Sequence, residues 1–229
     1  MARAIEVRLL GPLEVAVPGR NVEFEGAKQR RLFVALALRA PEPVPVDELV
    51  HAVWGDTPPN GREQALQKQV SRLRTRLGEQ LPVRRRTAGY ALEIEREAID
   101  SRRFEALRAA GEVEPALALW RGPALADHRF DEFAQAEITR LEDLRLEAIE
   151  ERGADVEELR ALVAEHPLRE RLRAALMRAL YRAGRQADAL AVMREGRRYL
   201  VDELGLEPGA PRTRRRSARR AASRPASRS

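Results

Sequence analysis

Residues 62–94, REQALQKQVSRLRTRLGEQLPVRRRTAGYALEI, decide the fold of this chain. Large apolar residues recur in the first half at positions 66, 70, 73 and 77, and this spacing of three to four residues places them along one face of a helix. The pattern therefore predicts a helix over 62–77 whose apolar stripe faces a small core. No acidic residue interrupts the segment from Lys68 to Leu77, so the outer face of this helix is polar and basic.

The outer face of the predicted helix carries the side-chain types that bind DNA. Arginine and glutamine are long enough to reach base edges in a major groove, whereas lysine and serine more often contact phosphates. At 100° per residue, the positions on this face and its shoulders are Gln64, Gln67, Lys68, Ser71, Arg72, Arg74, Thr75 and Arg76. A charged outer face is also ordinary for a solvated amphipathic helix, so the helix taken alone leaves that alternative open.

A basic hairpin is predicted directly after the helix. Residues 83–94 alternate in hydrophobicity, with Tyr90, Leu92 and Ile94 on one face of the second strand and the turn at residues 87–89. The cations that precede this turn are Arg84, Arg85 and Arg86. Such a run could merely solubilise the surface. A basic helix followed within about thirty residues by a basic hairpin is more specific, because a winged helix presents its reading helix and its wing to DNA in this order.

The residues before this stretch complete the same plan. Residues 5–24 alternate between apolar and polar positions and are broken twice by glycine and proline, which predicts short antiparallel strands. Helical spacing follows over residues 27–40, and Asp47 is the expected N-cap of a second short helix that continues to Trp54. A small sheet, three helices and a C-terminal hairpin make up the winged helix-turn-helix.

From residue 100 onward, helical spacing replaces strand alternation. Helices are expected at about 101–110, 113–120, 131–152, 155–165, 168–183 and 186–200. The last two, with small alanines at 187, 189 and 191, resemble the helical hairpin of a TPR repeat, although a plain helical bundle is nearly as compatible with the pattern. The predicted fold is therefore mainly α with a small N-terminal antiparallel β-sheet. Its architecture is a winged helix-turn-helix followed by an all-α TPR-like helical domain.

Charge and composition indicate the domain boundaries and the cellular compartment. We expect a DNA-binding domain over 1–98, a helical domain over 99–209 and a disordered Arg-rich tail over 210–229. The formal net charge of +6 comes from this tail, since residues 211–229 hold eight arginines and no acidic residue. A cytoplasmic, nucleoid-associated protein is expected because the chain has no cysteine, no apolar run of membrane-spanning length and no signal peptide.

Enzyme motifs are missing from the sequence. The three histidines lie on separate elements, no HExxH or phosphate-binding glycine motif is present, and the carboxylates sit at helical spacing from arginines. We therefore expect no enzymatic activity, no catalytic residue, no cofactor and no metal.

The chain resembles the SARP family of bacterial activators, which joins an OmpR-type winged helix to a bacterial transcriptional activator domain. The resembling segments are IEVRLLGPLEV at 5–15, AKQRRLFVALAL at 27–38, VDELVHAVWGDTPP at 46–59, LQKQVSRLRTRLG at 66–78, AGYALEI at 88–94, LALWRGPALAD at 117–127, EHPLRERLRAALMRALYRAGRQADAL at 165–190 and DELGLEPG at 202–209. By motif position, the resemblance places DNA contacts at Gln67, Lys68, Ser71, Arg72, Arg74, Arg86, Thr87 and Gly89. It also places Trp54 and Tyr90 in the winged-helix core and Trp120 in the core of the second domain.

The resemblance implies a sequence-specific activator of secondary-metabolite genes, antibiotic biosynthesis genes among them. Such a protein binds direct repeats in double-stranded promoter DNA and recruits RNA polymerase, and the sequence leaves a homodimer on DNA open. Two alternatives remain: a TPR-like module that binds proteins, and a nonspecific nucleic-acid binder that uses its basic tail.

Overall fold

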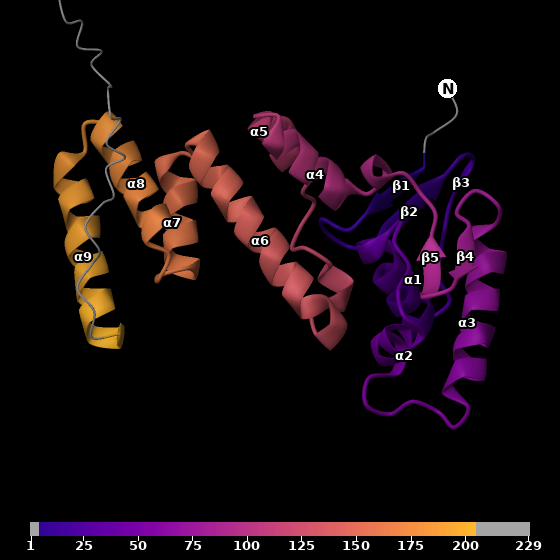
Figure 1. Ribbon diagram of the computed structural model, residues 1–229. Helices are drawn as coiled ribbons and strands as arrows, with labels where there is room; N and C mark the ends of the chain where they lie inside the picture. Colours follow the sequence, from indigo (N-terminus) through magenta and orange to yellow (C-terminus); the bar gives the residue numbers. More distant parts are fainter. Residues whose placement is uncertain (1–4, 205–229) are drawn as a thin grey trace, which may run out of the picture. The chain divides into compact units, whose positions relative to one another are not determined.

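The computed structural model describes residues 5–204, so the predicted Arg-rich tail over 210–229 lies outside the described residues. The chain is divided into two compact units between Ala154 and Asp155, and each is described by itself (Figure 1). The first unit contains β1 (Glu6–Arg8), β2 (Glu14–Val17), β3 (Arg20–Asn21), α1 (Ala27–Arg39), α2 (Val46–Trp54), α3 (Arg62–Leu77), β4 (Val83–Arg86), β5 (Gly89–Leu92), α4 (Asp100–Ala109), α5 (Val113–Leu117) and α6 (Glu132–Arg152), with single 3₁₀ turns at Arg96–Ala98 and Ala126–His128. The second contains α7 (Val156–Glu165), α8 (Glu170–Arg182) and α9 (Gln186–Leu204).

The N-terminal strands form the predicted antiparallel sheet, in the order β1-β2-β3. Val7 pairs with Val15, and Ala16 pairs with Asn21. Val7, Val15 and Val17 are buried because alternate strand positions face the helices. These residues share one apolar core with Leu32 and Leu36 of α1, so the sheet closes one side of that core; the sheet and α1 are drawn in Figure 1.

Helices α1, α2 and α3 form the helical core of the winged helix. The apolar stripe of α3 is completely covered, with Leu66, Val70, Leu73 and Leu77 no more than 1% exposed, as the sequence predicts. This burial fixes the rotation of α3 about its axis and therefore determines which side chains face outward.

The start of α2 differs from the prediction. Asp47 is not the N-cap, because α2 begins at Val46, the residue before Asp47. Pro45 holds the capping position. Proline fixes its own φ and suits the entry of a helix. The Asp47 carboxylate lies in the first turn, where it complements the helix dipole, and it pairs with the Arg62 guanidinium of α3 at 3.2 Å.

Strands β4 and β5 form the predicted hairpin, with Arg85 opposite Tyr90 and Arg86 opposite Gly89. Gly89 belongs to β5 rather than to the turn, which consists of Thr87 and Ala88. Tyr90 also pairs with Val44, in the segment between α1 and α2, through two backbone hydrogen bonds. β5 is therefore covered on both edges, which explains why all four of its residues are buried.

Helices α4, α5 and α6 belong to the same compact unit as the winged helix and share a second apolar cluster with it. Leu10, from the connection between β1 and β2, is buried there against Phe104 and Leu141. The Phe104 and Trp120 rings meet edge to face at 5.4 Å, so Trp120 packs against this cluster while it is itself only partly buried. The first three helices beyond residue 98 therefore pack on the winged helix.

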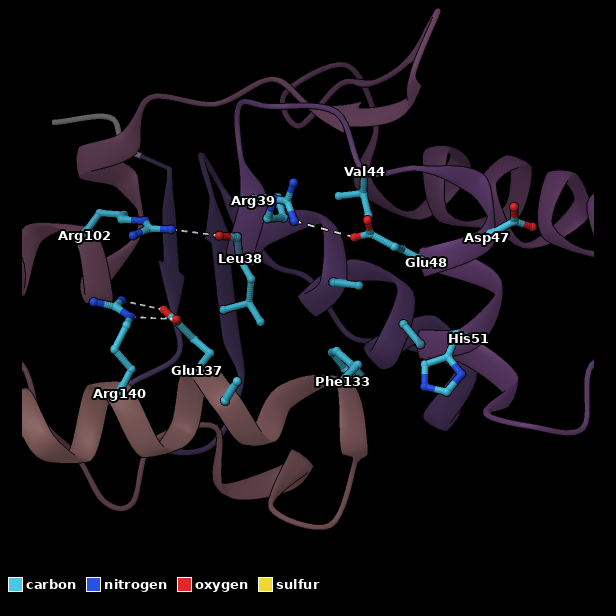
Figure 2. A pocket seen from close by; sticks show the side chains of 13 residues that line it. Leu38, Arg39, Val44, Asp47, Glu48, His51, Arg102, Phe133, Glu137 and Arg140 are labelled. Carbon is cyan, nitrogen blue, oxygen red and sulfur yellow. Dashed lines mark hydrogen bonds and ion pairs between the residues drawn. The ribbon is translucent and has the colours of Figure 1, made fainter.

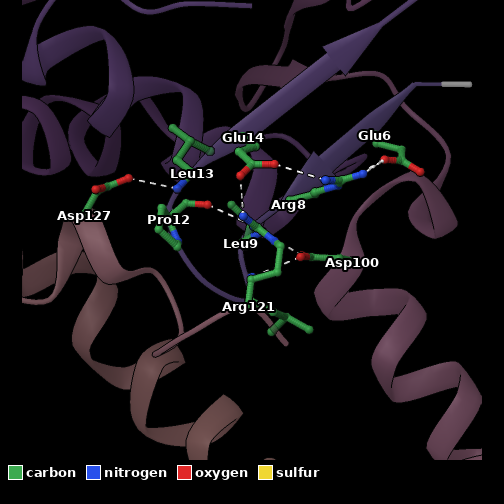
Figure 3. A network of polar contacts seen from close by, with 10 residues as sticks. Glu6, Arg8, Leu9, Pro12, Leu13, Glu14, Asp100, Arg121 and Asp127 are labelled. Atoms are coloured by element: carbon green, nitrogen blue, oxygen red, sulfur yellow. Dashed lines mark hydrogen bonds and ion pairs between the residues drawn. The ribbon is translucent and has the colours of Figure 1, made fainter. Parts of the chain in front are cut away.

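Polar contacts reinforce this packing (Figure 3). The buried Asp100 carboxylate accepts hydrogen bonds from the backbone N–H groups of Leu9, at 2.7 Å, and Leu10, at 3.1 Å. Arg121 donates to the Pro12 carbonyl at 2.9 Å, and Asp127 accepts from the Leu13 N–H at 2.8 Å. The loop between β1 and β2 consequently obtains its hydrogen bonds from residues more than 85 positions later in the sequence.

In the second unit, α8 and α9 form the predicted helical hairpin, joined at Gly184, whose positive φ of 74° suits glycine. The buried face of α9 differs from the prediction. Ala189 is buried, as are Val192 and Gly196, but the alanines at 187 and 191 are exposed. At Gly196, a Cβ atom would collide with the Arg173 side chain of α8, so glycine allows that side chain to lie against α9.

Candidate nucleic-acid interface

The outward surface of α3 is polar along its length. Of the predicted DNA contacts on this helix, those that are exposed are Gln67, Lys68, Ser71, Arg72, Arg74 and Thr75, and Arg76 is half-buried. Within residues 5–204, no salt bridge involves Lys68 or Arg72. Two cations one turn apart therefore point away from the protein without a carboxylate to neutralise them.

Arg74 and Arg76 are directed at the protein instead. The Arg74 Nε–H donates to the carbonyl of Val83, at the start of β4, at 2.8 Å. Arg76 forms an ion pair with Glu25, which precedes α1. Sequence spacing alone places both arginines on the shoulders of the basic face, but their guanidinium groups bind partners from other elements.

The C-terminal end of α3 is held by a residue that the sequence pattern does not reveal. Arg20, in β3, donates through Nη2 to the carbonyls of Arg76 and Leu77, at 2.9 and 3.1 Å. The last carbonyls of a helix have no partner within the helix, and a cation there also complements the dipole. Arg20 lies 56 residues before Arg76, so no local pattern connects the two.

The wing presents its arginines on the exposed edge of the hairpin. Arg84 lies 3.8 Å from the Glu93 carboxylate, and Arg86 forms an ion pair with the same group. The Arg85 guanidinium lies over the Tyr90 ring, 4.8 Å from its centroid. Since the side chains of Arg84 and Arg86 are more than half exposed, these pairs are weak and can give way to a phosphate.

Thr87 and Gly89, the other predicted wing contacts, differ in position. Thr87 is exposed at the tip of the hairpin, whereas Gly89 is buried against the backbone of Val44. Gly89 has φ +151°, and a Cβ atom built there would overlap the Val44 carbonyl. The structure therefore gives Gly89 a steric role, since the missing side chain allows the hairpin to approach the core.

Two aromatic residues that the family motifs assign to the winged-helix core are Trp54 and Tyr90. The Trp54 ring, at the end of α2, packs against the main core while remaining partly exposed, and the Lys28 ammonium lies 5.8 Å from its centroid. Tyr90 is 6% exposed and belongs to the same core. Trp54 and Tyr90 thus occupy the winged-helix core, as the family motifs imply.

A cavity of about 690 Å³ lies elsewhere in the first unit, between α1 and α2 on one side and α4 and α6 on the other (Figure 2). Its charged lining is largely self-paired: Arg39 lies 3.5 Å from Glu48, and Arg140 bonds Glu137 at 2.6 Å. The hydrogen bonds that Arg140 donates to the carboxylates of Glu137 and Glu105 raise the pKa of Arg140 against the opposing effect of burial. Neither Lys68 nor Arg72 lines this cavity.

Membrane spans and metal clusters are both missing from the described part of the chain. None of the helices there is long and apolar enough to cross a membrane. No group of three or more histidine, aspartate or glutamate side chains within residues 5–204 could hold a metal ion.

Both halves of the chain match families of known transcriptional regulators. Residues 20–92 match the family described as "Transcriptional regulatory protein, C terminal", and residues 91–219 match the "Bacterial transcriptional activator domain". The chain is 38% identical over 90% of its length to the regulatory protein AfsR of Streptomyces griseus, of which it spans 24%. It is 36% identical over 92% of its length to the transcriptional regulator RedD of Streptomyces coelicolor and spans 69% of that protein.

Two further relatives extend the comparison. The regulatory protein DnrI of Streptomyces peucetius is 32% identical over 90% of this chain, which spans 88% of DnrI. The solved structure of Mycobacterium tuberculosis EmbR in complex with a low-affinity phosphopeptide superposes with a TM-score of 0.79 at 33% identity, covering 90% of this chain and 62% of EmbR. AfsR, RedD and DnrI are all named as regulatory proteins. The two matched domains, in this order and on this fold, show that the chain belongs to the SARP family of transcriptional regulators.

Proposed function

We propose that the protein is a sequence-specific activator that inserts α3 into the major groove of promoter DNA and lays its β4–β5 hairpin along the adjacent backbone. The observation that carries this proposal is the exposed outer face of α3, with Lys68 and Arg72 free of ion pairs in the described structure, beside the three-arginine edge of the hairpin. A helix of this kind fits a major groove, and the cations of the hairpin displace counterions from phosphates.

The proposed roles follow from exposure. Arg72 and Gln67 are the candidates for base edges, and Lys68 is suited to a guanine or a phosphate. Ser71 and Thr75 are short and exposed, and suit phosphates or a close base. On the wing, the backbone contacts are assigned to Arg84, Arg85, Arg86 and Thr87.

The proposed targets are promoters of secondary-metabolite genes, including antibiotic biosynthesis genes. Each chain has one reading helix, so a direct repeat would bind two copies in the same orientation, spaced by about one helical turn of DNA or a multiple of it. This arrangement leaves a homodimer on DNA open. The helical activator domain, matched over residues 91–219, is the proposed contact with RNA polymerase.

Substitution of Arg72 or Lys68 by alanine is expected to weaken binding to the preferred site. Removal of one base-reading side chain costs about 1–3 kcal/mol, which is roughly a 5- to 150-fold loss of affinity. The preferred site is first selected from randomised duplexes with the full chain, and affinities are then measured at two salt concentrations. Arg178→Ala, which removes an exposed arginine of α8, is the matched control and should leave affinity unchanged.

The same measurement separates the alternatives. A TPR-like interaction module would not bind DNA even at low salt. A nonspecific binder would select no common sequence, would ignore Arg72→Ala, and would lose affinity when residues 210–229 are removed. Either result would overturn the proposed function.

A further inference from the structure

We propose that Arg74 is a positioning residue that fixes the wing relative to the reading helix, and does not itself read bases. This inference rests on the proposed function for its consequence on DNA. Its structural basis is independent of DNA, because it concerns contacts within the protein.

The first contact joins α3 to the outer strand of the hairpin. The Arg74 Nε–H donates to the Val83 carbonyl at 2.8 Å. Glu93 donates its N–H to the Pro82 carbonyl, so the next pair in the ladder, Val83 and Leu92, is a non-hydrogen-bonded pair. The Val83 carbonyl therefore points away from β5, and Arg74 supplies the donor that the ladder does not.

The second contact is with the aromatic ring beneath the wing. The Arg74 guanidinium carbon lies 5.9 Å from the Tyr90 ring centroid, and the Arg85 guanidinium carbon lies 4.8 Å from it. Tyr90 is anchored to Val44 by backbone hydrogen bonds of 2.8 and 3.0 Å. The guanidinium groups of Arg74, on α3, and Arg85, on the wing, thus both lie near the Tyr90 ring, which is fixed to the core.

These contacts matter because α3 and the wing must engage DNA together. Within the part of the chain that the structure describes, Arg74 makes the one side-chain hydrogen bond between α3 and the hairpin. Apolar packing joins the two elements as well, but it is non-directional, whereas a planar guanidinium that holds a carbonyl and faces a ring sets both distance and angle. Loss of Arg74 would leave the wing folded but less precisely placed.

The first test measures this placement without DNA. The chain has no cysteine, so spin labels can be attached at Gln67→Cys on α3 and Thr87→Cys on the wing without background labelling. We expect a narrow distance distribution in the parent chain, and a broader one in both Arg74→Ala and Arg74→Lys. Lysine keeps the charge but lacks the planar fork. An unchanged distribution in Arg74→Ala would overturn the proposal.

The second test uses the selected duplex and the full chain. Arg74→Ala should bind about tenfold more weakly, the size of a lost hydrogen bond to a charged group, with the same ranking of base substitutions. Phosphate protection by the wing should decrease, and the slope of log affinity against log salt should fall by about one for each phosphate that the wing no longer binds. The effect should be less than additive with that of Arg86→Ala, because both variants act through the wing.

Some results of these tests would assign Arg74 a different role. A relaxed preference at one base pair in Arg74→Ala would make Arg74 a base reader, and full binding by Arg74→Lys would make it a phosphate contact. Both results would overturn the inference while leaving the proposed function intact. If the parent chain selects no site, the proposed function fails, and the spin-label distances still decide the structural claim. Unfolding temperatures, measured in parallel, exclude a general loss of structure.

Discussion

Replacement of Gly89 by alanine is expected to destabilise the winged helix more than any other single methyl addition to a described glycine of the first unit. The new Cβ atom would overlap the Val44 carbonyl oxygen and lie 2.6 Å from the carbonyl carbon and 3.0 Å from Pro45 Cα. All three atoms are backbone, so no side chain can rotate away, and the φ of +151° is unfavourable for alanine. We expect a loss of at least about 4 kcal/mol, in the range that marks severe steric effects.

Urea unfolding of the full chain measures this effect, and Gly19→Ala is the matched control. Gly19 also has a positive φ, of 84°, but a Cβ atom there would meet nothing within 4 Å. Only backbone strain of about 1–2 kcal/mol is expected for it. Equal losses for the two variants would contradict the steric explanation, since they would show that the hairpin moves away from Val44 at little cost.

Replacement of Asp100 by alanine is the second large effect that we expect. The carboxylate is 2% exposed and accepts the N–H groups of Leu9 and Leu10. Burial raises the pKa of Asp100, against the opposing effect of these two hydrogen bonds. Alanine would leave both buried amides without an acceptor, at about 1–3 kcal/mol each, for a total of about 2–6 kcal/mol.

Asparagine at position 100 is the appropriate comparison. Its side-chain oxygen can accept one of the two amides, but its NH₂ group cannot accept the other, so Asp100→Asn should lose about half as much stability as Asp100→Ala. Hydrogen exchange should also accelerate in residues 9–13, which depend on Asp100, Arg121 and Asp127. Unchanged unfolding and exchange in Asp100→Ala would show that water replaces the carboxylate.

The elements of this fold follow from short-range patterns in the sequence. The stripe at 66, 70, 73 and 77 predicts both the existence of α3 and its rotation, because helical periodicity and burial are coupled within one element. The hairpin, the N-terminal strands and the helical second half follow in the same way. The family is likewise evident in the ordered motifs, and the comparisons confirm it.

The tertiary structure decided which partner each charged side chain of α3 binds. Eight side chains were predicted on one face of α3, yet Arg74 binds the hairpin and Arg76 binds Glu25, while Lys68 and Arg72 form no ion pair within the described residues. Position on a helix fixes the direction in which a side chain starts, but a long flexible arginine ends wherever another element supplies a carbonyl, a carboxylate or a ring.

The same limit explains the structural roles that the sequence did not reveal. Arg20, Gly89 and Asp100 act on partners 56, 45 and 91 positions away along the chain, through a helix end, a close backbone approach and a buried loop. Periodicity and local propensity report only on neighbours within a few residues. The sequence by itself therefore determined the elements, the buried face of α3 and the family, but not the buried face of α9. Folding decided which cations of α3 form no ion pair within the described residues, because that depends on which distant groups come within hydrogen-bonding distance of each cation.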